Sequence, residues 1–245
     1  MRVITAGNSR YRPIVELGVA QAHLMGYDVG LFDLGDLGIG WAHPIEVDPR
    51  LAVEGNYKVD EKGYPTKALH KPRMLREAQE RYGGSDLLYL DGDAILVRPV
   101  HDIFDHDFDV AVTVRPKHER DRTLRMRPAW DQWIGWVNAG VVALADSAGA
   151  VEFVHRWAAE CDRKGNDQFA LNEMVNPKHR RLRPGETWVE DGVRIHALDG
   201  QKYNFGGFHA PGYEEASILH LKTMVWQKEL KQLQLHCRRK SREFL

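Results

Sequence analysis

The sequence predicts an α/β protein with a mostly parallel central sheet flanked by helices. From its first residues, strand-like and helix-like segments alternate with short links, which is the pattern of a parallel α/β sheet. Residues 86–90, Asp-Leu-Leu-Tyr-Leu, are almost wholly apolar, as is typical of a strand that is buried on both faces. A chain of 245 residues is long enough to bury such a sheet within one domain.

The N-terminal half begins with a strand, a helix and a strand. Residues 2–6 are expected to form a short buried strand, and the following helix has Pro13 in its first turn and ends at Gly26. A second strand is expected over residues 29–34. Residues 35–65 are rich in Gly, Pro, Asp and Asn, and they are expected to form a long functional loop.

The same alternation continues toward the C-terminus. Ser147 is expected to cap a helix that runs to about Lys164 and ends at Gly165. The other expected elements are a helix over 66–82, strands over 108–114 and 137–144, a short helix after residue 168, strand-like pieces near 193–196 and 217–221, and an amphipathic helix over about 224–242. One sheet is expected to organise the whole chain.

The composition argues against several other classes of protein. Hydrophobic residues make up 43% and charged residues 28% of the chain, near the averages of soluble globular domains, which argues against disorder. With 34 basic and 35 acidic residues the net charge is −1, so a dedicated nucleic-acid binder is not expected. The two cysteines stand far apart in the sequence, which favours reduced thiols over a disulfide framework or a zinc ribbon. No signal peptide or membrane span is expected, and the predicted location is cytoplasmic.

Two acidic residues directly follow the apolar strand. Asp91 and Asp93 stand at the carboxyl end of this strand, where ligands bind in open α/β sheets, and Gly92 allows a ligand to approach the backbone closely. Two carboxylates held close together repel each other unless a cation lies between them, and their oxygens favour Mg²⁺ or Mn²⁺. Because such an ion also binds phosphate oxygens, the pattern suggests a nucleotide-diphosphate site. A strand-terminating turn with two solvated acids is the alternative.

The segment Leu88–Leu96, Leu-Tyr-Leu-Asp-Gly-Asp-Ala-Ile-Leu, resembles the DxD segment of GT-A-fold glycosyltransferases that use nucleotide-diphosphate sugars. Within these it is closest to the retaining, family-8-like group. Three more segments resemble that family in its order: Val137–Val142, Asn166–Asn172 and Ile218–Lys222. The resemblance implies a Rossmann-like GT-A domain over residues 1–245, with a nucleotide-binding half (1–114), a donor-sugar and acceptor half (115–222) and a C-terminal amphipathic helix (223–245).

The resemblance also implies a metal centre. Asp91 and Asp93 would hold the ion with His220 as the third ligand, and an imidazole beside two carboxylates makes Mn²⁺ the first choice and Mg²⁺ the second. The ion would stabilise the charge on the departing diphosphate, and Lys222 is predicted to steady that group. Without the resemblance, His220 is interpreted as an ordinary residue at a strand end.

Asp167 and Gln168 are the catalytic residues that the resemblance implies. Asn138 and Gln168 are predicted to recognise sugar hydroxyls, and Asp167 to orient them or the acceptor. Retention of the anomeric configuration is expected by a front-face route, because an amide is a poor nucleophile; covalent attack by Asp167 is the alternative. For residues 165–167, a plain helix stop and restart is the other interpretation. The predicted substrate-binding residues are Thr5, Ala6, Gly7, Asn8, Tyr11, Lys71, Arg73, Asp91, Gly92, Asn138, Ala139 and Lys222.

The predicted partners are a UDP-sugar donor and an acceptor that is a glycan, a lipid-linked glycan or a small molecule. Residues 115–136 combine Arg, Lys and three Trp, and are interpreted either as an acceptor-binding loop or as a loop whose tryptophans fill the core. The basic C-terminal helix is expected either to dock on the domain or to contact the inner face of a membrane. A homodimer is a further possibility.

Three alternatives compete with this metal-dependent, hexosyltransferase-like enzyme. A haloacid-dehalogenase-like phosphatase also places DxD after an apolar strand, but its acidic pair lies near the N-terminus and is followed by Thr-Leu, where this chain has Ala94-Ile95. A non-catalytic nucleotide-sugar-binding protein is the second alternative. A nucleotidyltransferase is the third, although a Gly-rich phosphate loop does not follow the first strand.

Overall fold

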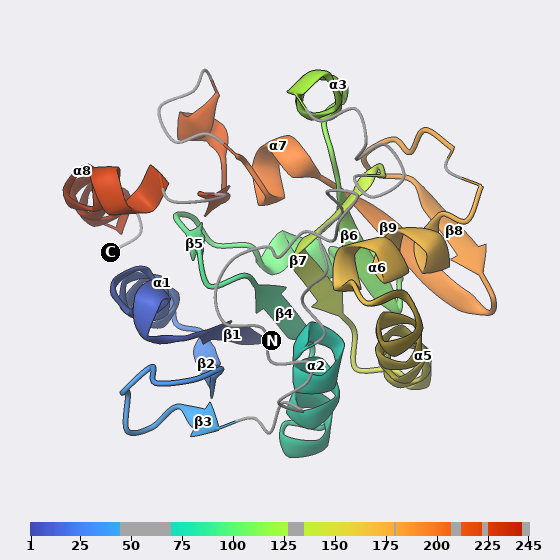
Figure 1. Cartoon of the computed structure of the whole chain (residues 1–245), viewed down its shortest axis with the longest axis horizontal. Helices are drawn as coiled ribbons and strands as arrows, with labels where there is room; N and C mark the ends of the chain where they lie inside the picture. The colour runs from blue at the N-terminus through green and yellow to red at the C-terminus, as the bar shows by residue number, and fades with distance from the viewer. Residues whose placement is uncertain (45–69, 127–134, 179, 207–211, 222–224, 242–245) are drawn as a thin grey trace.

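The structure is a computed structural model that describes residues 1–44, 70–126, 135–178, 180–206, 212–221 and 225–241 (Figure 1). Its strands are β1 (Arg2–Gly7), β2 (Asp28–Asp33), β3 (His43–Pro44), β4 (Leu87–Leu90), β5 (Ala94–Leu96), β6 (Val110–Val114), β7 (Val137–Leu144), β8 (Thr187–Glu190), β9 (Val193–Asp199) and β10 (Ile218–His220). Its helices are α1 (Arg12–Leu24), α2 (His70–Arg81), α3 (Lys117–Met126), α5 (Ala148–Lys164), α6 (Asp167–Val175), α7 (Gly200–Tyr203) and α8 (Val225–Ser241).

The central sheet has eight strands in the order β3-β2-β1-β4-β7-β6-β9-β8. The pairs β1–β2, β1–β4, β2–β3 and β6–β9 are parallel, and β7 runs antiparallel between β4 and β6. This arrangement confirms the predicted α/β class with a mostly parallel central sheet. The antiparallel strand β7 matters for function, because it brings the residues at its start to the carboxyl ends of β1 and β4.

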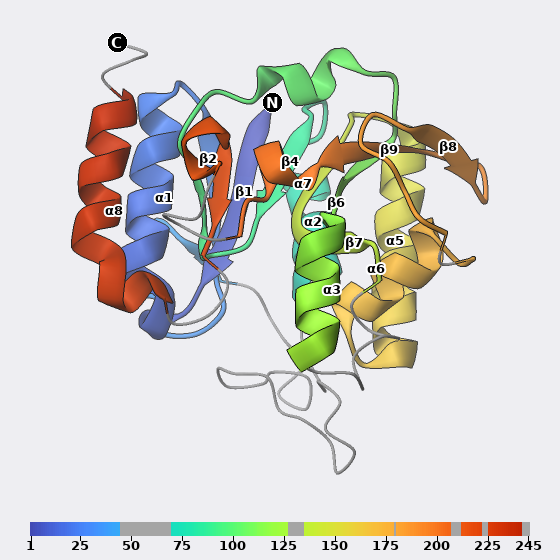
Figure 2. The same ribbon diagram turned by 90° about the horizontal axis from the view of Figure 1, so that it is seen from above.

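Helices cover the central sheet on both faces. The main apolar cluster joins α2, α5 and α6 to one face, with the fully buried Trp157 of α5 among its largest members. Burying one side chain of this kind contributes roughly 1.5–3 kcal/mol. Helix α1 packs on the other face, and α8 lies beside α1 in both views (Figures 1 and 2). The site described below lies between these two groups of helices.

Several local predictions are confirmed at α5 and α6. The Ser147 Oγ accepts a hydrogen bond from the backbone N–H of Ala150, which caps α5 as expected. Gly165 ends α5 in the left-handed conformation, with φ of 72°. Asn166 then caps α6 by accepting a bond from the backbone N–H of Phe169. The predicted helix stop and restart is therefore present, and it places Asp167 in the first turn of α6.

The prediction of a single sheet is wrong. The chain after β4 turns at residues 91–94, closed by a backbone bond of 2.8 Å from Ala94 N–H to the Asp91 carbonyl, and leaves the central sheet. Strand β5 then pairs antiparallel with β10 in a separate two-stranded sheet. In the register of this pair Ala94 lies opposite His220, so the histidine comes next to the acidic turn.

The basic segment after β6 is also different from the predicted loop. Its described part forms helix α3, stabilised in part by an ion pair one turn apart between Lys117 and Asp121. Trp136 is partly buried beneath the guanidinium of Arg120, whose central carbon lies 4.8 Å from the ring centroid. The other two tryptophans of the segment lie outside the described residues, as does most of the long loop predicted over residues 35–65.

The C-terminal helix docks on the domain. Leu233 and Cys237 of α8 are fully buried against Ile14 of α1, so this side of the helix faces protein. Burial raises the pKa of the Cys237 thiol to about 12, which makes it unreactive near neutral pH. In the part of the chain that the structure describes, no helix combines the length and the apolar character needed to cross a bilayer.

Candidate active site

The acidic turn between β4 and β5 is held tightly against the end of β1. A Cβ atom at Gly92 would lie 2.3 Å from the Ala6 carbonyl oxygen, so only glycine fits at the centre of the turn. The turn brings the side chains of Asp91 and Asp93 together at one side of the chain. This is the carboxyl end of β1 and β4, where the sequence places the ligand.

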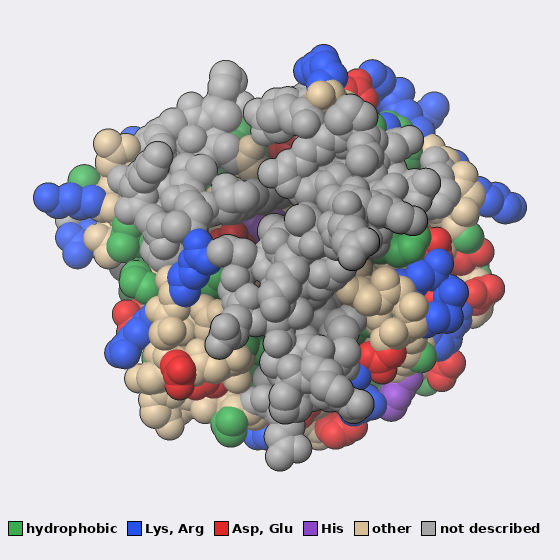
Figure 3. Space-filling view, in the orientation of Figure 1, with side chains coloured by type: hydrophobic (Ala, Val, Ile, Leu, Met, Phe, Trp, Pro, Cys, Tyr) green, Lys and Arg blue, Asp and Glu red, His purple; other side chains and the backbone are tan. Residues whose placement is uncertain are grey.

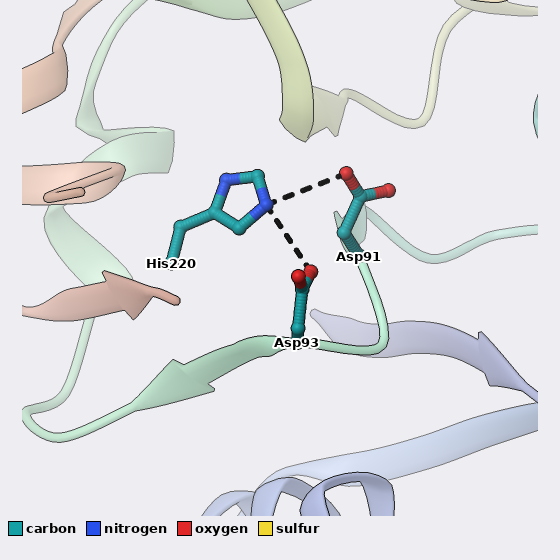
Figure 4. A group of neighbouring side chains, drawn as sticks. All are labelled: Asp91, Asp93 and His220. Atoms are coloured by element: carbon teal, nitrogen blue, oxygen red, sulfur yellow. Dashed lines mark ion pairs between the residues drawn. The ribbon is translucent and has the colours of Figure 1, made fainter. Parts of the chain in front are cut away.

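His220 at the end of β10 completes a group of three potential metal ligands (Figure 4). Its Nε2 lies 3.2 Å from Asp93 Oδ1 and 3.6 Å from Asp91 Oδ2. One ligand atom from each side chain lies within 4.8 Å of the other two. Two carboxylate oxygens and one imidazole nitrogen converging in this way fit a divalent cation. In the orientation of Figure 1, acidic and histidine atoms are visible at the bottom of a hollow near the centre of this face (Figure 3).

Gly140 of β7 makes room for this group. A Cβ atom there would lie 2.2 Å from His220 Cε1 and 3.0 Å from Asp91 Oδ2. Gly140 is also tied to the acidic turn, since its carbonyl accepts a bond of 2.9 Å from the backbone N–H of Asp91. Any larger residue at this position would displace the histidine, the aspartate or both.

A buried lysine connects the metal-ligand group to the predicted catalytic aspartate. Lys71 Nζ lies 3.0 Å from Asp91 Oδ1 and 2.9 Å from Asp167 Oδ2, and its side chain is only 7% exposed. Burial alone would lower the pKa of Lys71, but the charges of Asp167 and Asp91 outweigh it and raise the pKa above its usual value. Lys71 is therefore a permanent cation between two carboxylates. Its burial also shows that Lys71 does not lie on a solvated face of α2.

Tyr89 also binds Oδ1 of Asp91, the oxygen that Lys71 contacts. Its buried hydroxyl donates a hydrogen bond of 2.6 Å to Asp91 Oδ1. Burial would raise the pKa of Asp91, but Lys71, His220 and the bond from Tyr89 lower it below its usual value. With Oδ1 bound to Tyr89 and Lys71, the other oxygen of Asp91 is the one that faces His220.

The first residues of β7 extend beyond the end of β4 in the sheet. Side chains from α2 and α6 make hydrogen bonds with the backbone groups of these residues. Gln168 Nε2 donates to the Val137 carbonyl at 2.8 Å, and Gln168 Oε1 accepts from Ala139 N–H at 2.9 Å. Asn172 bonds both backbone groups of Val137, and Lys71 Nζ donates to the Ala139 carbonyl. The Gln168 amide is thus engaged at both ends by the strand.

The other predicted residues around the sugar lie close by. Asn138 is buried, and its Oδ1 accepts a bond of 2.8 Å from Gly140 N–H, which shapes the start of β7. Asp167 is 3% exposed, and its Oδ1 accepts a bond from the N–H of Gln168. Arg115 at the end of β6 reaches the same place, with Nη2 lying 3.3 Å from Gln168 Oε1. The sequence prediction did not single out this arginine.

The predicted nucleotide-binding residues lie at the end of β1 and in the turn that follows. Thr5, Ala6 and Gly7 are buried in β1, and Asn8 Oδ1 accepts from the Arg10 N–H to cap the next short helical turn. Tyr11 is half-buried there. Burial and then the nearby charge of Asp93 raise the pKa of Tyr11, so this ring lies close to the acidic pair.

Two predicted residues do not join this group. Arg73 pairs with Asp162 at 2.7 Å, in a groove between α2 and α5, and so the structure places it outside the site. The reason is helical geometry, because residues two apart on a helix point about 200° apart, and Lys71 takes the inward position. Lys222 lies outside the described residues.

Besides Arg115, sequence reasoning missed four residues that shape the site. The position of Tyr89 could have been predicted from the sequence. Residues two apart on a strand point to the same face, and Tyr89 precedes Asp91 by two. Gly140 and Asn172 lie inside matched segments, but nothing in the sequence shows what they contact. Asn204 lies in no matched segment, and it reaches the site only because β10 folds back beside it: its Oδ1 lies 2.7 Å from His220 Nδ1.

Comparisons with known sequences and structures show which proteins this chain is similar to. Residues 42–237 match the sequence model of the family described as nucleotide-diphospho-sugar transferase. No curated protein sequence gives a significant match. The fold is similar to that of a glycosyltransferase involved in glycosylation of the major capsid of PBCV-1, with a TM-score of 0.58 and 13% identity, covering 94% of this chain and 98% of that chain.

Two further solved structures are similar in fold. The galactosyltransferase LgtC, in complex with donor and acceptor sugar analogues, has a TM-score of 0.57 and 12% identity, with coverage of 99% of this chain and 96% of that one. The glycosyltransferase GlyE of Streptococcus pneumoniae TIGR4 has a TM-score of 0.52 and 14% identity, with coverage of 99% and 63%. At such identities the likeness concerns the fold, and it confirms the GT-A fold expected from the sequence.

Proposed function

The chain belongs to the nucleotide-diphospho-sugar transferase family, and from this premise we propose that it is a metal-dependent glycosyltransferase that uses a UDP-sugar. The observation that carries the proposal is the convergence of Asp91, Asp93 and His220 from two separate segments at the carboxyl end of β4. Two carboxylates held this close repel each other unless a cation lies between them, so the arrangement supports a bound divalent ion.

The three residues would hold Mn²⁺, with Mg²⁺ as the second choice. A divalent cation there would stabilise the negative charge that develops on the departing diphosphate. Thr5, Ala6, Gly7, Asn8 and Tyr11 would bind the nucleoside beside Gly92, because they line the end of β1 next to the acidic turn. Lys222, two residues beyond His220, is proposed to steady the diphosphate.

The donor sugar would lie against the start of β7 and the first turn of α6. Asn138, Ala139, Asp167 and Gln168 line this region, and Lys71 supplies a fixed positive charge. The Gln168 amide is held by two backbone bonds and is a poor nucleophile, which supports retention by a front-face route rather than attack by this side chain. Asp167 as a covalent nucleophile is the second candidate, and its ion pair with Lys71 would oppose it.

We propose a single transferase domain over residues 1–245, in which residues 1–114 bind the nucleotide and residues 115–222 bind the sugar and acceptor. Residues 223–245 are proposed as its C-terminal amphipathic helix. The family-8-like assignment rests on the motifs alone. The acceptor class, the homodimer, the membrane contact and the cytoplasmic location stay predictions. The buried side of α8 leaves less apolar surface for a membrane than the sequence suggests.

Hydrolysis of a panel of nucleotide sugars, with Mn²⁺ or with a chelator, tests this proposal. We expect metal-dependent turnover of at least one donor, reduced at least about 100-fold in Asp93→Ala, because charge stabilisation on the leaving group supplies several kcal/mol. Asp107→Ala is the control, since this aspartate is 81% exposed and pairs with Arg194. Equal turnover in Asp93→Ala and the control would refute the metal assignment, and release of phosphate from a simple monoester would favour the phosphatase.

A further inference from the structure

A buried chain of hydrogen bonds leads away from the far side of His220. His220 Nδ1 lies 2.7 Å from Asn204 Oδ1, and Asn204 Nδ2 donates to the Thr113 hydroxyl at 2.6 Å. The Thr113 hydroxyl in turn donates to the Asn138 carbonyl at 3.1 Å. The chain therefore runs from β10 through the end of α7 and β6 to the start of β7.

All of these side chains are shielded from water. Thr113 is fully buried, Asn204 is 3% exposed and His220 is 6% exposed. The backbone holds Asn204 in place, because Phe205, its neighbour, donates to the Ile218 carbonyl and accepts from His220 N–H. Polar groups buried to this degree must satisfy one another, so each donor in the chain needs an acceptor.

The direction of each bond follows from the last acceptor. The Asn138 carbonyl can only accept, so the single proton of the Thr113 hydroxyl points to it. The hydroxyl oxygen then accepts from Asn204, which must present its NH₂ group on that side. The carbonyl oxygen of Asn204 therefore faces His220, and it requires a proton on Nδ1.

A neutral imidazole with its proton on Nδ1 has a lone pair on Nε2. That nitrogen is the one that faces the oxygens of Asp91 and Asp93. Its lone pair is therefore directed at the place where the two carboxylates would hold a divalent cation. Gly140 leaves room for the ring in this orientation, because a Cβ atom there would lie 2.2 Å from Cε1 and 2.6 Å from Nδ1 of His220.

We propose that Asn204, braced by Thr113, is a positioning residue that holds His220 in the Nδ1-protonated form and so presents Nε2 as a metal ligand. The inference rests on the proposed metal-dependent transfer and deepens it. A partner of this kind, which fixes the tautomer of a ligating histidine, typically changes metal affinity by about 10–100-fold. Because imidazole favours a transition-metal ion over Mg²⁺, Asn204 would also bias the site toward Mn²⁺.

The first measurement needs no metal. A long-range ¹H–¹⁵N correlation spectrum of the chelator-treated protein reports which imidazole nitrogen of each histidine carries the proton, and His220→Gln identifies the His220 signals. We expect the proton on Nδ1 in the wild-type protein. An Nδ1 that carries no proton would overturn the inference.

The second measurement is Mn²⁺ binding, followed by electron paramagnetic resonance. Asn204→Leu should weaken binding by about 10–100-fold, and it should weaken Mg²⁺ binding less. Asn204→Asp keeps an acceptor for Nδ1–H and should bind Mn²⁺ at least as tightly as the wild type. Thr113→Val leaves Asn204 free to turn, so its loss of affinity should lie between these two.

Asn176→Leu is the matched control. This asparagine, which follows the last residue of α6, is also 3% exposed. Its side-chain amide makes hydrogen bonds with the backbone carbonyl and N–H of Arg180. It should lose stability but bind Mn²⁺ like the wild type. If Asn204→Leu binds Mn²⁺ as tightly as this control, the inference is wrong. Should Asn204→Leu fail to fold, the wild-type spectrum and Thr113→Val decide.

The failure of the proposed function has a different signature. Wild-type protein that does not bind Mn²⁺, or that binds it without a nitrogen coupling in the spin-echo spectrum, would contradict the metal assignment. The tautomer spectrum is recorded without metal, so it still tests the role of Asn204 in that case.

Discussion

A lysine, a tyrosine and an aspartate are bonded together in two places: the site trio of Lys71, Tyr89 and Asp91, and the outer trio of Lys202, Tyr203 and Asp102. In both, the tyrosine hydroxyl donates to the carboxylate at 2.6 Å. The lysine side chain is 7% exposed in the site trio and 44% exposed in the outer trio. The local chemistry is the same, and the surroundings differ.

The trios differ in what else their members contact. In the outer trio both donors bind Asp102 Oδ2, and the lysine extends into solvent. In the site trio both bind Asp91 Oδ1, while Oδ2 faces His220 and the lysine also pairs with Asp167. The site trio thus joins a proposed metal ligand to a catalytic candidate, whereas the outer trio connects α7 to the short helical segment at residues 101–105.

Removing the lysine from each trio should give the largest contrast. Lys71→Met leaves Asp91 and Asp167 buried without their cation, so we expect a loss of about 3–5 kcal/mol in the free energy of unfolding. Lys202→Met removes an exposed pair and should cost at most about 1 kcal/mol. Urea unfolding of the two variants measures both values. Losses of similar size would show that burial does not separate the trios.

Removing the tyrosine hydroxyl tests the trios for metal binding. Tyr89→Phe keeps the packing but leaves Asp91 Oδ1 with Lys71 as its one remaining partner among the described residues, so we expect Mn²⁺ affinity to fall about 10-fold, as is typical when a partner of a metal ligand is lost. The lost bond to a charged group should also cost about 1.5–3 kcal/mol. Tyr203→Phe should leave Mn²⁺ affinity unchanged. Titration with Mn²⁺ compares the two, and equal affinities would contradict a role for Tyr89.

The outer trio should contribute a smaller, pH-dependent effect. Burial would raise the pKa of Asp102, but the bonds from Lys202 and Tyr203 lower it below its usual value. The folded pKa is therefore below the unfolded pKa of about 3.9, so the stabilisation is present above that pH and is lost as the pH falls through the folded value.

Asp102→Asn should remove this part of the pH dependence. In thermal unfolding between about pH 2 and pH 6, the melting temperature of this variant should fall slightly less steeply with decreasing pH than that of the wild type. Asp105→Asn changes an exposed aspartate three residues later and serves as the control. A melting temperature of Asp102→Asn that falls as steeply with decreasing pH as that of the control would contradict this account.

Much of the site was predictable because it depends on short-range patterns. Asp91 and Asp93 follow an apolar strand whose burial is visible in four residues, and Asn166 is a recognisable helix cap before Asp167. The placement of His220 beside the acids came from the family resemblance. The structure supplies its physical cause, which is the antiparallel pairing of β10 with β5.

The rest depends on contacts between segments far apart in the sequence. Asn204 reaches His220 because β10 folds back along residue 205, and no local pattern encodes this pairing. Arg73 was placed in the site from its sequence neighbours, although helical geometry turns it away from Lys71. Helix α3 was missed because its charges resemble those of a loop, and their pairing along one helix face becomes visible only once the helix exists.

The start of β7 has one more consequence. In the sheet, β4 ends before it reaches the first residues of β7, so these residues have no strand beside them on that side. Their backbone amide and carbonyl groups would normally be open to pairing with a strand from another molecule. The side chains of Lys71, Gln168 and Asn172 make hydrogen bonds with these groups instead. The start of β7 can therefore lie without a neighbouring strand on this side and still offer no template for aggregation.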